Sequence, residues 1–222
     1  RLFIGDPYNK WNMKLFRDTK ITHLPTLRTI YLIGDSHAGH YGAAMTHIAG
    51  KKEFNFVMHP LGIGLKLLNR KSKEELVLAP LRNYKKHFKK GDIIIFSAHL
   101  SKYKNRHDWT KQYETFLQQT ENIGMKFILI SPTPSFSGVR GVRGRYTCQE
   151  EWYRPSWAIS PLCFGEINKS EWLASNNAPL TLIEKFLLAN PKVSYIDAFS
   201  VLCPNPYCKN HDQHSFMYMD NS

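Results

Sequence analysis

Short runs of apolar residues alternate along the chain with longer segments in which apolar residues recur every three or four positions. The short runs are almost continuously apolar and are bounded by Gly, Pro or charged residues, a pattern typical of strands that are buried on both faces of a sheet. We expect strands at residues 29–33, 54–58, 92–96, 125–130 and 193–196. The alternation predicts an α/β protein with a mostly parallel, five-stranded sheet.

The longer segments predict helices between these strands. We expect helices at residues 38–49, 72–90, 108–122 and 179–190. The second of them is interrupted near Pro80, because proline removes a helical hydrogen bond. The third carries aromatic and apolar residues at helical spacing that are expected to face the core: Trp109, Tyr113, Phe116 and Leu117.

The junction between the first strand and the first helix carries the strongest candidate for chemistry. Gly34, Asp35, Ser36 and His37 follow the strand directly. A Ser at this position projects from the carboxyl end of the sheet, where open α/β folds place their sites. The free N–H groups of the following helix can stabilise an oxyanion, and Gly34 permits a sharp turn. The alternative is a turn in which Asp35 or Ser36 only caps the helix.

Length and composition favour one globular domain. The chain has 222 residues, of which 42% are hydrophobic. Residues 28–222 are expected to form that domain, with a long irregular insertion at about 131–170, and residues 1–27 an extension or linker packed on it. No run approaches the ~20 apolar residues of a membrane span. Because Arg1 is not a start residue, we expect the chain to be a fragment of a longer protein.

The formal net charge of +12 indicates an anionic neighbour, which is a nucleic acid, a membrane surface or an acidic glycan. Lysines cluster at residues 85–90 and arginines at 140–145. For the lysine cluster we favour a solvated helix face. Nucleic acid is the least favoured partner, because the chain contains no recognised nucleic-acid module.

Four cysteines allow three pairings. We expect the disulfides Cys203–Cys208, which closes a turn-rich segment, and Cys148–Cys163, which brackets an irregular one; both imply an oxidising compartment. The alternative is a zinc site that combines the last two cysteines with nearby histidines. Only two residues separate Cys208 from His211, too few for the usual zinc-finger spacing, so no metal is expected.

The residues Gly34 to His37 after a hydrophobic strand resemble the first conserved block of the SGNH/GDSL hydrolases. The cysteine pair Cys203–Cys208 and the closing residues 218–220 resemble one subgroup, the SGNH domain fused to acyltransferase-3 membrane proteins that O-acetylate bacterial surface glycans. The resemblance implies a three-layer, doubly wound sandwich of the SGNH-hydrolase or flavodoxin-like type.

The resemblance also implies roles for residues near the first block. Ser36 corresponds to the nucleophile, and its own N–H to one oxyanion donor. A glycine of the second block supplies another donor, with Gly62 the first choice and Gly64 the second. The family's third block has an Asn that is absent at this place in the chain, so either Ser97 or His99 replaces it or two backbone donors suffice. For His99 we favour a structural role. The alternative for both glycines is a plain flexible turn.

Asp220 corresponds to the acid of the family's Asp-x-x-His block, whose His is the general base. In this chain that His is expected immediately after Ser222, beyond the last residue. The substrate-binding candidates are His37 and three aromatic residues of the insertion. These aromatic residues either stack on sugar faces or pack a small core of the insertion itself: Trp152, Tyr153 and Trp157.

These features predict an extracytoplasmic domain, on the periplasmic or outer face of the bacterial inner membrane. It is expected to transfer an acetyl group to a sugar hydroxyl of a surface polysaccharide, such as O-antigen, lipopolysaccharide or peptidoglycan, through an acyl-serine. The partners are a carbohydrate acceptor and a fused or associated acyltransferase-3 membrane domain, which supplies the acetyl group, ultimately from acetyl-CoA. No cofactor and no nucleic acid are expected. The alternatives are a carbohydrate esterase and a non-catalytic glycan-binding module.

Overall fold

A parallel sheet of five strands organises the part of the chain that the computed structural model describes. That part comprises residues 24, 26–34, 36–60, 85–97, 108–134 and 165–209. The strands are β1 (Thr29–Gly34), β2 (Asn55–Pro60), β3 (Ile93–Ser97), β4 (Lys126–Ile130) and β6 (Val193–Ile196). They lie in the order β2-β1-β3-β4-β6 and all run in the same direction, so the predicted α/β class and the five predicted strands are confirmed.

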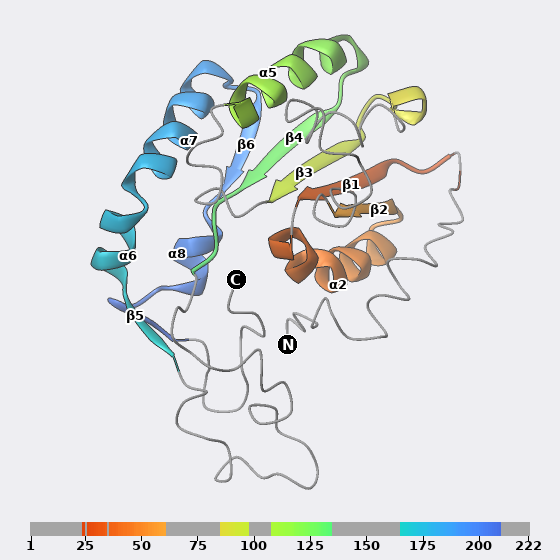
Figure 1. Cartoon of the computed structure of the whole chain (residues 1–222). Helices are drawn as coiled ribbons and strands as arrows, with labels where there is room; N and C mark the ends of the chain where they lie inside the picture. Colours follow the sequence, from red (N-terminus) through yellow and green to blue (C-terminus); the bar gives the residue numbers. More distant parts are fainter. Residues whose placement is uncertain are drawn as a thin grey trace, which may run out of the picture.

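Helices cover both faces of the sheet (Figure 1). On one face lies α2 (Ser36–Lys51), and on the other lie α5 (Asp108–Thr120) and α7 (Asn177–Ala189). The short 3-10 helices η1 (Lys85–His87) and η3 (Glu121–Ile123) precede β3 and β4. The remaining elements lie near the end of the chain: β5 (Glu166–Asn168), α6 (Lys169–Ser175), α8 (Ala198–Leu202) and β7 (Tyr207–Lys209), with β5 and β7 forming a separate antiparallel pair.

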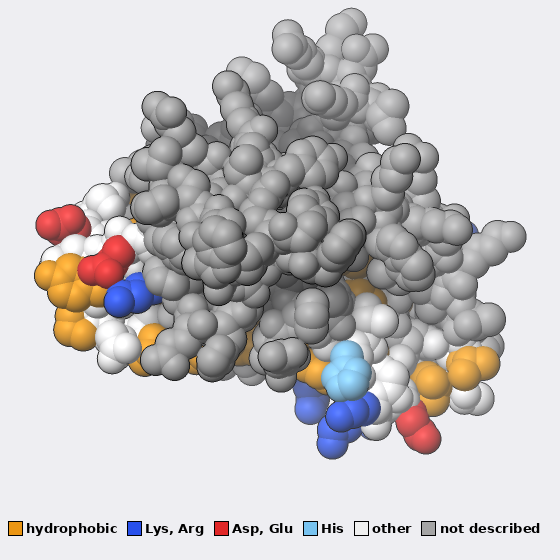
Figure 2. Space-filling view, turned by 90° about the horizontal axis from the view of Figure 1, so that it is seen from below, with side chains coloured by type: hydrophobic (Ala, Val, Ile, Leu, Met, Phe, Trp, Pro, Cys, Tyr) orange, Lys and Arg blue, Asp and Glu red, His pale blue; other side chains and the backbone are white. Residues whose placement is uncertain are grey.

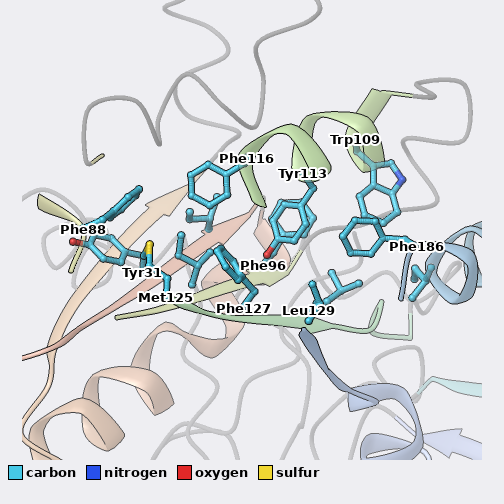
Figure 3. Packing of buried hydrophobic residues seen from close by; sticks show 14 of the residues in the cluster. Tyr31, Phe88, Phe96, Trp109, Tyr113, Phe116, Met125, Phe127, Leu129 and Phe186 are labelled. Atoms are coloured by element: carbon cyan, nitrogen blue, oxygen red, sulfur yellow. The ribbon is translucent and has the colours of Figure 1, made fainter. Parts of the chain in front are cut away.

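The larger core lies between the sheet and the α5/α7 layer and is dominated by aromatic rings (Figure 3). The ring of Tyr113 lies 5.1 Å from that of Phe96 on β3 and 5.5 Å from that of Phe186 on α7, measured between centroids. Trp109 and Phe116 of α5 are also buried, and Leu117 packs against this cluster. The predicted core face of this helix is therefore confirmed.

The second core lies between the sheet and α2. Strand residues alternate between the two faces, so Ile30 and Leu32 of β1 point toward α2 while their neighbours point to the aromatic core. The buried Ala38 and Ala49 and the half-buried Tyr41 and Met45 recur along α2 at intervals of three or four residues. This spacing keeps one stripe of α2 against β1 and β2.

Two predicted helices differ from the structure at their ends. The helix expected at 72–90 does not reach residue 90: η1 ends at His87, and the chain then turns at Gly91, which has a φ of +85°. The turn buries Phe88 beside Tyr31 instead of leaving it on a helix. The helix expected at 38–49 begins earlier, at Ser36, so the candidate nucleophile is the first residue of the helix.

The insertion expected to be irregular over about 131–170 ends sooner than predicted. The strand β5 starts at Glu166 and α6 starts at Lys169, where Asn168 caps the helix by accepting hydrogen bonds from the N–H groups of Ser170 and Glu171. Residues 131–134 are buried at the end of β4. The sequence does not predict β5, α6, α8 and β7, because each element is too short to show a periodic pattern.

A buried carboxylate joins the amino ends of three strands. Asp92, which is fully buried, precedes β3 and accepts hydrogen bonds from the N–H of Thr29 and the N–H of Lys89, both at 2.8 Å. Its carbonyl oxygen accepts from the N–H of Lys126 at the start of β4. Charged acceptors make stronger hydrogen bonds than neutral ones, so Asp92 fixes the register at this edge of the sheet.

We expect Asp92→Asn to lower the free energy of unfolding by about 1–3 kcal/mol, because one of the two N–H groups would then face an amide donor inside the protein. The measurement is denaturant unfolding followed by circular dichroism.

Asp197→Asn is the matched control. Asp197 is exposed and accepts a hydrogen bond from the N–H of Ser200 as the N-cap of α8, a position where Asn and Asp are equally good. Its effect should stay within about 0.5 kcal/mol. Equal losses in the two variants would contradict the role assigned to Asp92.

Candidate active site

The order of the strands defines where a site can form. The chain runs outward from β1 to β2 on one side and from β1 to β3, β4 and β6 on the other, so the winding reverses between β1 and β3. In open α/β sheets, ligands bind beyond the carboxyl ends of the strands at this switch point. The segment that leaves β1 carries Ser36, and the segment that leaves β3 begins after Ser97.

The carboxyl ends of three strands meet at Gly34. Gly34 is in register with Pro60 of β2 on one side and with Ser97 of β3 on the other. A Cβ atom at position 34 would overlap the carbonyl oxygen of Ser97 and would lie 2.7 Å from the Cβ of Ala38 in the first turn of α2. Only glycine therefore allows the sheet edge and the start of α2 to come this close.

The reason for a glycine at position 34 differs from the prediction. A sharp turn was expected there, but Gly34 does not adopt a positive φ; among the described glycines, only Gly91 and Gly124 do. Gly34 is required by the close contact with Ser97 and Ala38. Contact of this kind ties the position of Ser36, two residues later, to the end of β3.

Ser36 begins α2 at the carboxyl edge of the sheet. Ser36 therefore belongs to the first turn of α2. The first N–H groups of a helix have no partner within it, so a helix that starts at Ser36 can supply backbone donors next to this residue. The side chains of Ser36 and His37 lie outside the described part of the structure.

Ser97 is the last residue of β3, and 1% of its surface is exposed. By the alternation of β3, its side chain lies on the same face as Ile93 and Ile95, which is the face that α2 covers. The Ser97 side chain therefore lies at the carboxyl edge of the sheet, on the face that α2 covers.

The other predicted site residues lie outside the described residues. They are the glycines Gly62 and Gly64, the aromatic residues Trp152, Tyr153 and Trp157, the acid Asp220, and the cysteines Cys148 and Cys163. What the structure does describe is where the adjoining segments start: residue 61 follows β2 at Pro60, next to Gly34, and residue 210 follows β7.

A small platform at the end of the chain anchors two of these segments. We define the C-terminal platform as residues 165–176 and 197–209. Trp172 of α6 stacks on Phe199 of α8 with ring centroids 4.0 Å apart, and both are buried. The pairing of β5 with β7 sets Glu166 opposite Lys209, so the end of the insertion and the start of the last segment lie side by side.

The predicted disulfide between Cys203 and Cys208 is present and lies in the platform. Both cysteines are buried against Trp172 and Phe199. Lys169 donates a hydrogen bond from Nζ to the carbonyl oxygen of Cys203 at 3.1 Å. Two sulfur atoms that are bonded to each other do not act as zinc thiolate ligands, so the disulfide favours the predicted pairing over a zinc site at these cysteines.

Polar residues also join the carboxyl ends of β4 and β6. The Ser131 hydroxyl accepts a hydrogen bond from the N–H of Phe199 at 2.9 Å, which fixes the start of α8. Burial raises the pKa of Tyr195 on β6, nearby Asp197 raises it further, and a hydrogen bond with Ser131 opposes these effects. This group of residues supports the turn into the platform, and no pattern in the sequence predicts it.

Figure 2 shows the molecule from below the view of Figure 1, the side on which α2 lies. Lys or Arg side chains gather beside a His at one border of this face.

In the described part of the chain, no group of three or more His, Cys, Asp or Glu residues is arranged to hold a metal ion. No helix within the described ranges is long and apolar enough to cross a membrane.

Comparison with known proteins gives a family and a fold. The family model described as "SGNH domain (fused to AT3 domains)" matches residues 12–222. The periplasmic domain of the lipopolysaccharide acetyltransferase from Salmonella ser. Paratyphi A has a similar structure, with a TM-score of 0.53 and 14% sequence identity over 96% of this chain and 87% of that one. No curated protein matches the chain.

We expect Gly34→Ala to lower the free energy of unfolding by about 3 kcal/mol, at the upper end for an overpacked site, because the added methyl group meets backbone atoms of β3 that cannot move aside. Denaturant unfolding measures the change.

Gly50→Ala is the control for the loss of a glycine. Gly50 lies in the last turn of α2, and a Cβ there meets no atom within 4 Å. Alanine favours helix over glycine by about 0.5–1 kcal/mol, so this variant should be more stable than the wild type. A Gly34→Ala protein with wild-type stability would show that the contact with Ser97 is not required.

Proposed function

Because the chain belongs to the family of SGNH domains that are fused to AT3 domains, we propose that it transfers an acetyl group to a sugar hydroxyl of a bacterial surface polysaccharide. The observation that carries this proposal is the position of Ser36, the first residue of a helix at the switch point of a doubly wound sheet. The similar fold of a lipopolysaccharide acetyltransferase domain supports the same class of substrate.

Ser36 is the nucleophile in this proposal. Its Oγ attacks the carbonyl carbon of the acetyl donor, the donor's leaving group departs with a proton, and an acetyl-serine ester remains. A sugar hydroxyl then attacks the ester and releases Ser36. Both steps pass through a tetrahedral oxyanion, which backbone N–H groups at a helix start can stabilise.

The N–H of Ser36 and the N–H of Gly62, or else of Gly64, are the proposed oxyanion donors. The segment of the two glycines leaves β2 at Pro60, whose register partner is Gly34, so it starts beside the strand that carries the nucleophile. Ser97 is the third candidate. The Ser97 side chain is buried on the face of the sheet that α2 covers. In this proposal it either donates a hydrogen bond to the oxyanion or packs against the backbone around Ser36.

Asp220 is the proposed acid that orients a histidine base. The base removes the proton of the attacking hydroxyl and returns it to the leaving group, while the acid holds the ring in the correct tautomer. The segment of Asp220 follows β7, which the disulfide and the Trp172–Phe199 stack hold in the C-terminal platform. The insertion with Trp152, Tyr153 and Trp157 ends beside it at β5 and is the proposed acceptor-binding segment.

We further propose that this domain works outside the cytoplasm beside an AT3 membrane domain that delivers the acetyl group. Such a location agrees with the disulfide, because disulfides persist in oxidising compartments. With water as the acceptor the same site is a carbohydrate esterase. Exclusion of water and orientation of the sugar decide between the two activities.

The test of the nucleophile is Ser36→Ala in the protein that carries the complete catalytic block. Transfer of acetyl to the glycan should fall by ~10³-fold or more, by analogy with other serine triads. Stability should fall by at most ~1–2 kcal/mol, because one hydroxyl at a helix start is lost. A fluorophosphonate probe should label the wild type and not the variant.

Thr46→Ala is the matched control, since it removes one hydroxyl from the same helix. Thr46 is exposed, and its hydroxyl donates a hydrogen bond to the carbonyl oxygen of Gly42 in the same helix. This variant should retain acetyl transfer and labelling. If Ser36→Ala keeps near-wild-type activity, Ser36 is not the nucleophile, and the turn at residues 34–37 serves only to cap the helix.

Replacement of both Cys203 and Cys208 by Ser should cost about 2 kcal/mol of stability, because the closed loop is short. We expect acetyl transfer to fall more than the folded fraction does, since β7 leads into the segment of Asp220. Comparison of the specific activity with the fraction folded at the assay temperature measures this. Activity that only follows the folded fraction would contradict a role for the platform in catalysis.

A further inference from the structure

The amino edge of the sheet, opposite the Ser36 edge, carries a continuous series of basic side chains. Because all five strands are parallel, the residues that precede them lie together at this edge. We define the basic rim as the following residues: Arg28, Lys51, Lys52, Lys85, Lys86, Lys89, Lys90, Lys126 and Lys192. All of them are exposed except Lys89, which is half-buried.

Contacts between neighbouring strands hold the rim together. The side chain of Arg28 packs over Gly91, and that of Lys90 packs over Gly124; a Cβ atom at either glycine would lie within 3.4 Å of these side chains. The N–H of Gly91 donates to the carbonyl of Gly124 at 2.9 Å. The turns before β1, β3 and β4 therefore present their positive charges from one fixed surface.

Few acidic side chains offset this charge among the described residues. Glu121 is exposed but is paired with Lys192, which lowers the pKa of Glu121. Glu53 is exposed at the end of the α2 segment. Asp92 is buried and accepts two backbone hydrogen bonds. The rim therefore keeps an excess of positive charge on one edge of the domain.

Two exposed leucines border the rim. Leu24 is 53% exposed and is held there by Asn55, which bonds to its N–H and to its carbonyl oxygen. Leu188 is 83% exposed near the end of α7, shortly before Lys192. Exposed apolar side chains beside lysines are typical of surfaces that contact the headgroup region of a bilayer.

We propose that the basic rim docks on an anionic phospholipid surface. Lysine ammonium groups on flexible stems attract a layer of phosphates without the fixed geometry that a single ligand requires. Leu24 and Leu188 then lie at the level of the headgroups. The inference rests on the proposed location of the domain beside a membrane, but its test does not depend on Ser36.

Docking of this kind sets the orientation of the site. The strand β1 has six residues, so Ser36 lies about 20 Å from the rim. This distance is about twice the Debye length at physiological salt, so the lipid charge acts on the rim and hardly reaches the other edge. The carboxyl edge faces away from the lipid and stays open to the glycan.

The experiment measures co-sedimentation of the 222-residue chain with vesicles. Vesicles of phosphatidylcholine with about one-third phosphatidylglycerol should bind the protein at low salt, and pure phosphatidylcholine should not. Binding should weaken steeply as salt rises, because the charges are screened. Absence of binding to the anionic vesicles at low salt would overturn the proposal.

The decisive comparison uses two pairs of charge reversals with the same change in net charge. Lys86→Glu with Lys126→Glu alters the rim, whereas Lys111→Glu with Lys209→Glu alters exposed lysines on α5 and β7. Loss of one rim lysine should lower the vesicle partition coefficient about fivefold. The first pair should therefore lower this coefficient by at least ~20-fold, and the second pair by far less. Equal losses would show that only net charge matters and would overturn the proposal.

A third measurement distinguishes binding to a lipid surface from binding to soluble polyanions. Leu188→Ser should weaken binding to the anionic vesicles several-fold and leave binding to heparin unchanged. Ser36→Ala should bind vesicles like the wild type, so loss of acetyl transfer and loss of docking are distinguishable. Tighter binding to heparin than to vesicles at equal charge concentration would assign the rim to an acidic glycan and overturn the lipid proposal.

Discussion

The contact between Gly34 and Ser97 is the constraint on which the candidate site depends. It brings the carboxyl ends of β1 and β3 together, and it lets the first turn of α2 approach the sheet through Ala38. Any side chain at position 34 would push these elements apart. The position of Ser36, two residues later, therefore depends on this packing of the backbone. The winding of the sheet reverses at the same place, which opens the space that a substrate needs.

We propose different functions for the amino edge and the carboxyl edge of the sheet. At the amino edge, the Asp92 carboxylate fixes the entry into β1, and the Asn55 side chain bonds to the backbone of Leu24 and Leu27. Both are buried polar groups whose hydrogen bonds are made inside the protein, so they specify one register. This rigid edge carries the lysines, while the carboxyl edge carries the segments proposed for chemistry. A surface that holds the domain and a site that acts on a glycan can thus work at opposite ends of the same strands.

The sequence predicts those parts of the fold whose residues repeat. Five apolar runs gave five strands, and the spacing of Trp109, Tyr113 and Phe116 gave the buried face of α5. Prediction failed where single contacts decide the structure. The helix η1 ends at His87, and the chain turns at Gly91, which has a positive φ, while Asp92 bonds to the backbone of this turn. None of these features leaves a periodic trace in the sequence. The Trp172–Phe199 stack and the Ser131–Phe199 hydrogen bond join residues that are far apart in sequence, so no local pattern announces them.

The candidate site was predictable to a different degree. Ser36 could be found because its strand, turn and helix are contiguous in sequence, whereas its proposed partners come from segments that are far from it in sequence. The C-terminal platform holds the ribbon of β5 and β7 together without a large hydrophobic core of its own. A disulfide, one stacked aromatic pair and a lysine bonded to the Cys203 carbonyl hold a two-stranded ribbon whose strands lead to the insertion and to the segment of Asp220. Such local cross-links suit an extracytoplasmic domain, since they hold the ribbon together at little cost in buried apolar area. The ribbon therefore fixes the point where the insertion ends and the point where the segment of the proposed acid begins.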